Sequence, residues 1–266
     1  MTPPNTFRSL QDSTLHRNIA PLSALAHWQD WPSAAQLNGL LAANMTTAAG
    51  HALSFSYDGQ AGDEGAAAYE TLIDQTGIIP LRPRHWHDLF NALMWISFPA
   101  TKATLNATHR RELAGSAGPV RSARRDALTL LDECGVLLVI DHENWTALHR
   151  AHDWTALFIE HRAAWGQHIV PMTIGHGLLE QCLAPYVGLT AKALHVLMPK
   201  DWFTLPDHER HAALDEKLHH AIARDECLMS TKELLPLPVL GIPGWWPANE
   251  EASFYANTRY FRPARS

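Results

Sequence analysis

The sequence predicts a mainly α-helical protein with a small β-sheet, an α+β fold in which residues 1–266 form a single compact domain. Helical periodicity covers most of the chain, whereas only a few short apolar runs, such as VLLVI at 136–140, have the composition of strands. Apolar residues make up 46% of the 266 residues, which is enough to bury a substantial core. The segment 236–263 is rich in proline and tryptophan, so it is predicted to be an irregular arm packed on the domain.

Residues that start or stop helices set the expected elements in the first half of the chain. Ser33 is suited to cap a helix start, Gly77 to end a helix, and Pro99 cannot lie inside a continuous one. Residues 1–31 are expected to be irregular and residues 58–65 to form a loop. The remaining pattern predicts a strand at 52–57 and helices at 34–44, 66–75, 84–98 and 99–113.

The second half follows a flexible link at residues 115–119. Apolar residues recur there with either the helical or the strand period. Strands are expected at 136–140, 169–174 and 193–198, and helical segments at 121–133, 145–149, 154–165, 176–186 and 209–227.

Charge and cysteine content exclude several classes of protein. The net charge is −6 and the only basic cluster lies around Arg121, Arg124 and Arg125, so no nucleic-acid partner is expected. The three cysteines are far apart and form no CxxC motif, which predicts neither a disulfide framework nor a cysteine-rich zinc site. Neither a signal peptide nor an apolar run of 18 residues occurs, so we expect a cytoplasmic protein without a membrane partner. The oligomeric state is left open.

Five sequence blocks occur in an order that resembles a known family. They are WHDLFNALMWISFPATKATLN, RRDALTLLDECG, WTALFIEHRAAW, GHGLLE and LGIPGWWPANEEASFYANTRYFRP. Over roughly residues 69–263 the chain is similar to the bacterial family catalogued as domain of unknown function 3025. The resemblance implies that these blocks form one structural unit. It brings no established activity, so it supplies no mechanism.

Four sets of polar residues stand out as candidates for chemistry. Polar groups beside a core-forming helix face either form specific hydrogen bonds or carry chemistry, because burying them unpaired is costly. Each set falls at helical spacing or within one short segment. The sets are His87 with Asp88 and Asn91; Asp126 with Thr129, Asp132 and Glu133; His176 with Glu180; and Arg262 with Asn249 and Tyr255.

These sets predict a metal-dependent hydrolase that acts on a small anionic substrate. Imidazole and carboxylate ligands from several helices suit a divalent zinc, manganese or iron ion. The predicted metal ligands are His87, Asp88, Asp132 and His176. Glu133 or Asp126 would be the general base, and Arg125 or Arg262 would hold the anionic group. The predicted substrate-binding residues are Asn91, Trp86, Trp245 and Tyr255.

Three other interpretations stay open. The polar residues could be structural, with Asp88 paired to Arg84, and Cys134 could be an inert thiol or a nucleophile near His176. The protein could bind a small ligand or peptide without catalysis, in a cleft walled by Trp86, Trp95 or Trp245. It could also be an interaction protein that docks through the helix at 209–227. No HExxH, P-loop or GxSxG motif decides among these functions.

Overall fold

The computed structural model confirms a mainly helical α+β fold with two small sheets. It describes residues 7, 10, 13–16, 19, 25, 28, 30–58, 65–115 and 121–264. The predicted link at 115–119 lies outside these ranges, apart from residue 115. The chain divides into two compact units, one made of residues 1–129 and 207–233 and the other of residues 130–206 and 234–266. The assignment of residues 1–266 to one domain stays a prediction.

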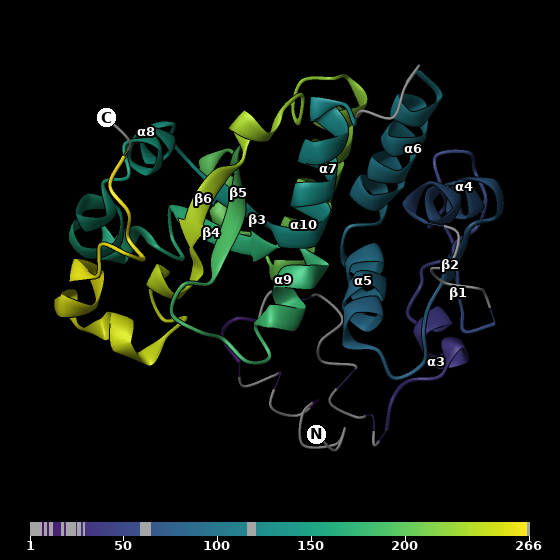
Figure 1. The fold of residues 1–266 in the computed structure, drawn as a ribbon, viewed down its shortest axis with the longest axis horizontal. Helices are drawn as coiled ribbons and strands as arrows, with labels where there is room; N and C mark the ends of the chain where they lie inside the picture. Colours follow the sequence, from purple (N-terminus) through teal and green to yellow (C-terminus); the bar gives the residue numbers. More distant parts are fainter. Residues whose placement is uncertain are drawn as a thin grey trace. The chain divides into compact units, whose positions relative to one another are not determined.

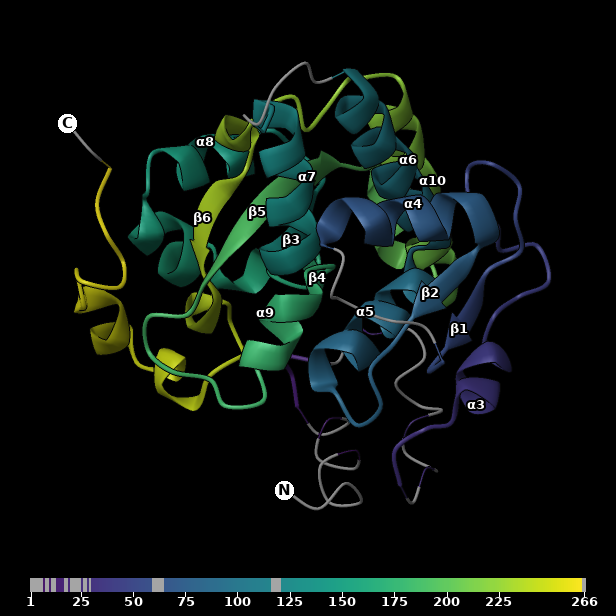
Figure 2. The same cartoon turned by 45° about the vertical axis from the view of Figure 1, so that its right-hand side comes forward.

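The first unit is mainly helical. Its elements are α3 (Ala34–Asn38), β1 (Ser54–Ser56), α4 (Ala66–Thr76), β2 (Ile78–Pro80), α5 (Trp86–Ser97), α6 (Pro99–Gly115), the first part of α7 (Ala123–Cys134) and α10 (Asp207–Ala223). Strands β1 and β2 pair in parallel and lie side by side in Figures 1 and 2. Gly77, which ends α4 as predicted, adopts a left-handed conformation with φ 73°.

Two features of this unit differ from the prediction. Helix α3 is capped by Ser33 and Gln36 as a capping box, but it ends at Asn38 instead of residue 44. The Asn38 side chain bonds both backbone groups of Phe55, with its Oδ1 2.6 Å from the nitrogen and its Nδ2 3.1 Å from the oxygen. Strand β2 was not predicted. It has three residues, and pairing with β1 rather than local sequence makes it a strand.

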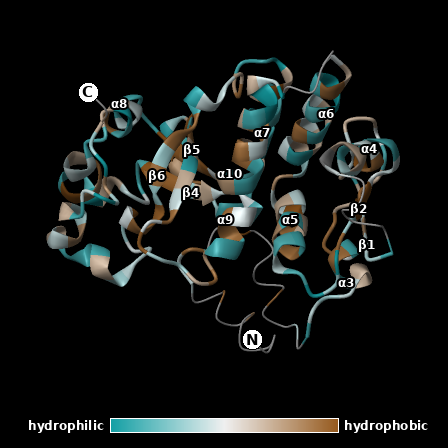
Figure 3. Cartoon of the chain, viewed as in Figure 1, coloured by the Kyte–Doolittle hydropathy of each residue, from teal (hydrophilic) through white to brown (hydrophobic). Residues whose placement is uncertain are grey.

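Helices α5 and α6 supply much of the buried interior of this unit. Most of the buried residues of α5 are apolar, and most of those of α6 are polar. Nine of the twelve residues of α5 are buried, and Figure 3 shows both hydrophobic (brown) and hydrophilic (teal) stretches in this helix. The start of α6 is capped from a distant helix, because the Asp215 carboxylate of α10 accepts from the backbone nitrogens of Ala100 (3.0 Å) and Thr101 (2.8 Å). A buried carboxylate therefore fixes α10 against the first turn of α6.

The second unit is built around a four-stranded sheet with the order β4-β3-β5-β6. Strand β3 pairs antiparallel with β4 and parallel with β5, and all six of its residues are buried. The elements are the end of α7, β3 (Gly135–Ile140), α8 (Asn144–Arg150), β4 (Ile169–Thr173), α9 (His176–Gln181), β5 (Thr190–Leu197) and β6 (Leu235–Pro238). Helix α9 is shorter than the predicted 176–186, and the predicted helix at 154–165 is a π-helical turn followed by a 3-10 turn.

Strand β6 corrects the expectation that the proline-rich segment has no regular structure. It pairs antiparallel with β5, with Leu237 opposite Ala191 and Pro236 opposite Lys192. The backbone nitrogen of Val239 donates to Leu189, which shows that the odd-numbered residues bond to β5. Pro236 and Pro238 therefore direct their nitrogens, which have no hydrogen to donate, toward the outer edge. An edge strand tolerates proline at those alternate positions.

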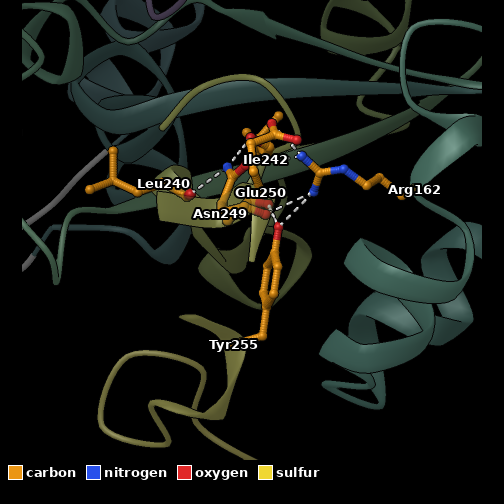
Figure 4. A network of polar contacts seen from close by, with 7 residues as sticks. Arg162, Leu240, Ile242, Asn249, Glu250 and Tyr255 are labelled. Atoms are coloured by element: carbon orange, nitrogen blue, oxygen red, sulfur yellow. Dashed lines mark hydrogen bonds and ion pairs between the residues drawn. The ribbon is translucent and has the colours of Figure 1, made fainter. Parts of the chain in front are cut away.

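The rest of the C-terminal arm is irregular, as predicted, and a polar network holds it (Figure 4). Asn249 is fully buried, and its Nδ2 donates to the carbonyl oxygens of Leu240 (2.8 Å) and Ile242 (2.7 Å). The guanidinium of Arg162 donates to the carbonyl and side-chain oxygens of Asn249 and pairs with Glu250 at 2.7 Å. The network satisfies backbone groups that the arm cannot pair within a sheet.

A buried histidine pair joins α8 to the sheet. His149 has no exposed surface, and its Nε2 lies 3.0 Å from the carbonyl oxygen of Pro236. A carbonyl only accepts, so Nε2 carries the proton and Nδ1 accepts from Nε2 of His195, 3.1 Å away. Burial lowers the pKa of His149 to about 4 and that of His195 to about 3, so both rings are neutral at pH 7.

The histidine pair predicts a loss of stability in acid. Between pH 6.5 and about 4, the unfolded chain binds protons that the folded chain excludes, so the free energy of unfolding falls as the pH falls. Each excluded proton contributes up to about 1.4 kcal/mol per pH unit. We expect His149→Gln to flatten this slope by about one proton in urea unfolding between pH 4.5 and 7.5. The control is His208→Gln, because the His208 side chain is 83% exposed. Equal slopes in wild type and His149→Gln would contradict the assignment.

Candidate functional site

His176 and two neighbouring carboxylates form the candidate site of the second unit. His176 is the first residue of α9, and only 4% of it is exposed. Its Nε2 lies 3.5 Å from Oε1 of Glu133, and its Nδ1 lies 3.9 Å from Oδ2 of Asp132. Asp132 and Glu133 end helix α7. The structure thus brings together three residues that the sequence placed in two separate sets.

Two glycines make this meeting possible. A Cβ atom on Gly175 would lie 2.3 Å from the backbone nitrogen of Gly135, and one on Gly135 would lie 2.1 Å from the carbonyl oxygen of Leu131. The carbonyl oxygen of Gly135 accepts from the backbone nitrogens of Ile174 (3.1 Å) and Gly175 (2.9 Å). Because neither backbone carries a side chain at the crossing, the start of α9 approaches the end of α7 closely.

The two carboxylates face different nitrogens of the imidazole ring, so they have different chemical roles. A divalent ion bound by one nitrogen and one oxygen, each about 2.1 Å away, sets these two atoms roughly 3.0–3.4 Å apart. The His176–Glu133 separation of 3.5 Å is close to that geometry. A carboxylate on the opposite nitrogen orients a metal-binding histidine. Asp132 stands on that side.

The imidazole and the two carboxylates differ in how far they are exposed to solvent. The His176 side chain is 6% exposed, whereas those of Asp132 and Glu133 are 25% and 41% exposed. The imidazole is therefore fixed by packing while the carboxylates reach solvent. Cys134, the adjacent thiol, does not fit the role of nucleophile. Its burial, together with the charge of Glu133, raises its pKa and keeps the thiol protonated.

In the first unit, Asp88 has a structural partner other than the one suggested by the sequence. Arg82 donates to it from the backbone nitrogen (2.7 Å), Nε (2.9 Å) and Nη2 (2.6 Å). Burial alone would raise the pKa of Asp88, but these hydrogen bonds and the charge of Arg82 outweigh burial and lower it. Arg84, the expected partner, has φ 56° and pairs with Asp30 at 3.5 Å. Both oxygens of Asp88 are thus engaged by Arg82.

Asn91 belongs to a buried polar chain that includes a lysine absent from the sequence-based site. Its Nδ2 donates to the hydroxyl of Tyr69 (2.8 Å), and its Oδ1 accepts from Nζ of Lys102 (3.0 Å). Lys102 is only 4% exposed, and its ammonium lies 5.5 Å from the ring centre of Trp95. A lysine eleven residues after Asn91 in an otherwise apolar and small-residue stretch, SFPATKATL, is the signal that could have identified it. His87, on the same helix α5, is partly exposed and meets His85 edge to face.

Three further residues of the first unit were predicted for the site, and their surroundings differ. Asp126 forms an ion pair with Arg121 (3.1 Å) on the exposed side of α7, and Arg125 lies half-buried one residue before it. Trp86 packs in an aromatic cluster with Phe7, Trp31 and Phe90.

In the second unit, the Tyr255 hydroxyl donates to the carbonyl of Gly241 (2.9 Å) and accepts from Arg162 (Figure 4), which is a structural role in the arm. Trp245 is half-buried in a turn of the same arm. Arg262 lines a pocket whose walls include none of Asp132, Glu133 and His176.

The chain belongs to the family described as a protein of unknown function, DUF3025, whose model matches residues 53–265. This match confirms the resemblance seen in the sequence and extends it toward the N-terminus, so that it also takes in β1 and the start of α4. No curated protein and no solved structure matches the chain. Among the described residues, none of the helices is both long and apolar enough to cross a bilayer.

The close approach of Gly135 and Gly175 predicts that one added methyl group will lower the stability of the protein. Gly175→Ala places a Cβ against the backbone of Gly135 and Cys134, and relief of that overlap requires α9 to move away from α7. We expect a loss of roughly 1–3 kcal/mol in the free energy of unfolding, measured in urea. Gly115→Ala is the control, because a Cβ there would meet no atom within 4 Å. Equal stability of the two variants would show that the crossing is not close-packed.

Proposed function

We propose that this protein is a metal-dependent hydrolase whose metal is held by Nε2 of His176 and by the carboxylate of Glu133. The single observation that supports the proposal is the approach of a buried imidazole nitrogen to a partly exposed carboxylate at 3.5 Å. Asp132 has the role of an orienting residue on the opposite nitrogen. The sequence suggested Asp132 as a ligand and Glu133 or Asp126 as the base. In this proposal Glu133 is a ligand as well as the base, and Asp132 orients the imidazole.

The chemistry follows from the charges at the site. A divalent ion held at this site would supply an activated water and a positive charge. The second oxygen of the Glu133 carboxylate would accept the proton that this water loses as it attacks the electrophilic carbon or phosphorus of the substrate. The bond to the leaving group then breaks, and the proton held by Glu133 passes to that group. The metal and the substrate's anionic group attract each other, which suits a small anionic substrate.

The sequence-based hypothesis named further ligands, and the structure affects them differently. Asp88 leaves the proposed set because Arg82 occupies both of its oxygens. His87 and the substrate-binding role of Arg125 remain assignments from the sequence. His87→Ala is therefore tested beside the other variants. The proposed binding of a metal by His176 and Glu133 does not require His87 as a ligand.

The first test is a metal analysis of the full chain. The protein is stripped with chelator, incubated separately with zinc, manganese and ferrous iron, passed through a desalting column and analysed by elemental mass spectrometry. We expect about one ion per chain in wild type and near-complete loss in His176→Ala and Glu133→Gln. Asp132→Asn should weaken metal affinity by about 10–100-fold, because it removes the orienting charge.

The matched control is Asp126→Asn, which removes one carboxylate from the same helix where it pairs with Arg121. It should retain the metal, and the retained ion should support hydrolysis of p-nitrophenyl ester or phosphate substrates. Absence of metal from wild type, or equal retention by wild type and His176→Ala, would contradict the proposal.

A further inference from the structure

A pocket of about 530 Å³ lies at the C-terminal arm of the second unit. This volume is in the range of small-molecule sites. Its walls come from the segment after α8, the loop before β5, strand β6 and the end of the arm, and they include two aromatic rings and two arginines. Six of the lining residues are Trp154, Tyr260, Pro236, Pro238, Arg259 and Arg262.

The polar atoms of both rings are already used within the protein. Nε1 of Trp154 donates to the carbonyl oxygen of Arg262 at 2.7 Å. The Tyr260 hydroxyl donates to the carbonyl of Leu189 (2.6 Å) and accepts from the backbone nitrogen of Leu240 (2.9 Å). Trp154 is also stacked on Phe158, with 12° between the rings. These two side chains are therefore fixed, and they offer the pocket ring surface instead of hydrogen bonds.

The charge of the pocket is opposite to that of the whole chain. The protein carries 27 acidic and 21 basic residues, yet the described residues that line this pocket include two arginines and no acidic residue. Within the ranges that the structure describes, neither Arg259 nor Arg262 forms an ion pair with a carboxylate. Nε of Arg262 donates to the carbonyl oxygen of Arg259 at 3.2 Å, which places the two residues side by side. Two such guanidinium groups suit an anionic oxygen pair.

We propose that this pocket binds a small organic anion, a carboxylate carried on a flat apolar body. The carboxylate would lie at Arg259 and Arg262, and the flat body against Trp154, Tyr260 and the two prolines of β6. The site is separate from His176, and the inference does not rest on the proposed hydrolase activity.

Isothermal titration calorimetry with a matched pair of probes tests this inference. The first probe is 2-naphthoate, which has the flat body and the charge. The second is 2-naphthamide, which has the same body without the charge. We expect wild type to bind 2-naphthoate at least about tenfold more tightly than 2-naphthamide, and we expect this preference to shrink as salt is added.

Variants then locate the binding site. Arg259→Gln and Arg262→Gln should each weaken 2-naphthoate binding by about tenfold and leave 2-naphthamide unchanged. The bonds from Trp154 and His152 end on the backbone carbonyl of Arg262, so the substitution retains them. Lys200→Gln removes one exposed positive charge from the same unit outside the pocket and should have no effect.

Circular dichroism and thermal melting confirm that each variant is folded. No heat from 2-naphthoate at millimolar concentration in wild type would overturn the inference. So would unchanged 2-naphthoate affinity in a folded Arg259→Gln, Arg262→Gln double variant.

Discussion

The backbone contact between Gly135 and Gly175 is the constraint on which the second unit depends. Gly135 directly follows helix α7 and begins the central strand β3, and Gly175 is the N-cap residue that precedes α9. Two hydrogen bonds to a single carbonyl oxygen fix the crossing. A helix end that carries carboxylates and a helix start that carries an imidazole are thereby held together. The position of the candidate site thus follows from the packing of the backbone.

Local signals predicted much of the fold. The Ser33 cap, the Gly77 stop and the break at Pro99 all mark helix termini in the structure, because each acts locally. Ser33 acts through its side-chain oxygen, and Gly77 and Pro99 act through their backbone geometry. Strands β2 and β6 were missed because pairing with a distant partner makes them strands. In β6, proline occupies only positions whose nitrogens face away from β5, a distinction that composition does not reveal.

For the candidate site too, the sequence indicated individual residues but not the contacts between residues from distant segments. Sequence identified His176, Asp132 and Glu133 as polar residues at helix ends, but the nitrogen that each carboxylate faces depends on how α7 and α9 cross. It offered Arg84 as one possible partner of Asp88, whereas Arg84, which has a left-handed backbone, pairs with Asp30 and Arg82 pairs with Asp88. Lys102 was missed because a single lysine in a helix ordinarily reaches solvent, and only tertiary packing buries this one.

The C-terminal arm gains its order from polar bonds, not from secondary structure. Asn249, Arg162 and Tyr255 satisfy its backbone groups on one side, and His152 and Trp154 bond the carbonyl of Arg262 on the other. Tyr255, expected to contact substrate, is part of this scaffold. An arm with fixed ends holds its arginines in place, and this explains how an irregular segment forms the wall of a defined pocket.

The proposal that the glycine crossing holds His176 and Glu133 as a metal site can be tested by crystallography. Crystals of the chelator-stripped chain are soaked in zinc, and anomalous diffraction is collected on both sides of the zinc absorption edge. We expect an anomalous peak about 2.0–2.1 Å from Nε2 of His176 and within coordination distance of the Glu133 carboxylate. A zinc-soaked crystal with no peak at that position, and with Nε2 hydrogen-bonded directly to Glu133, would contradict it.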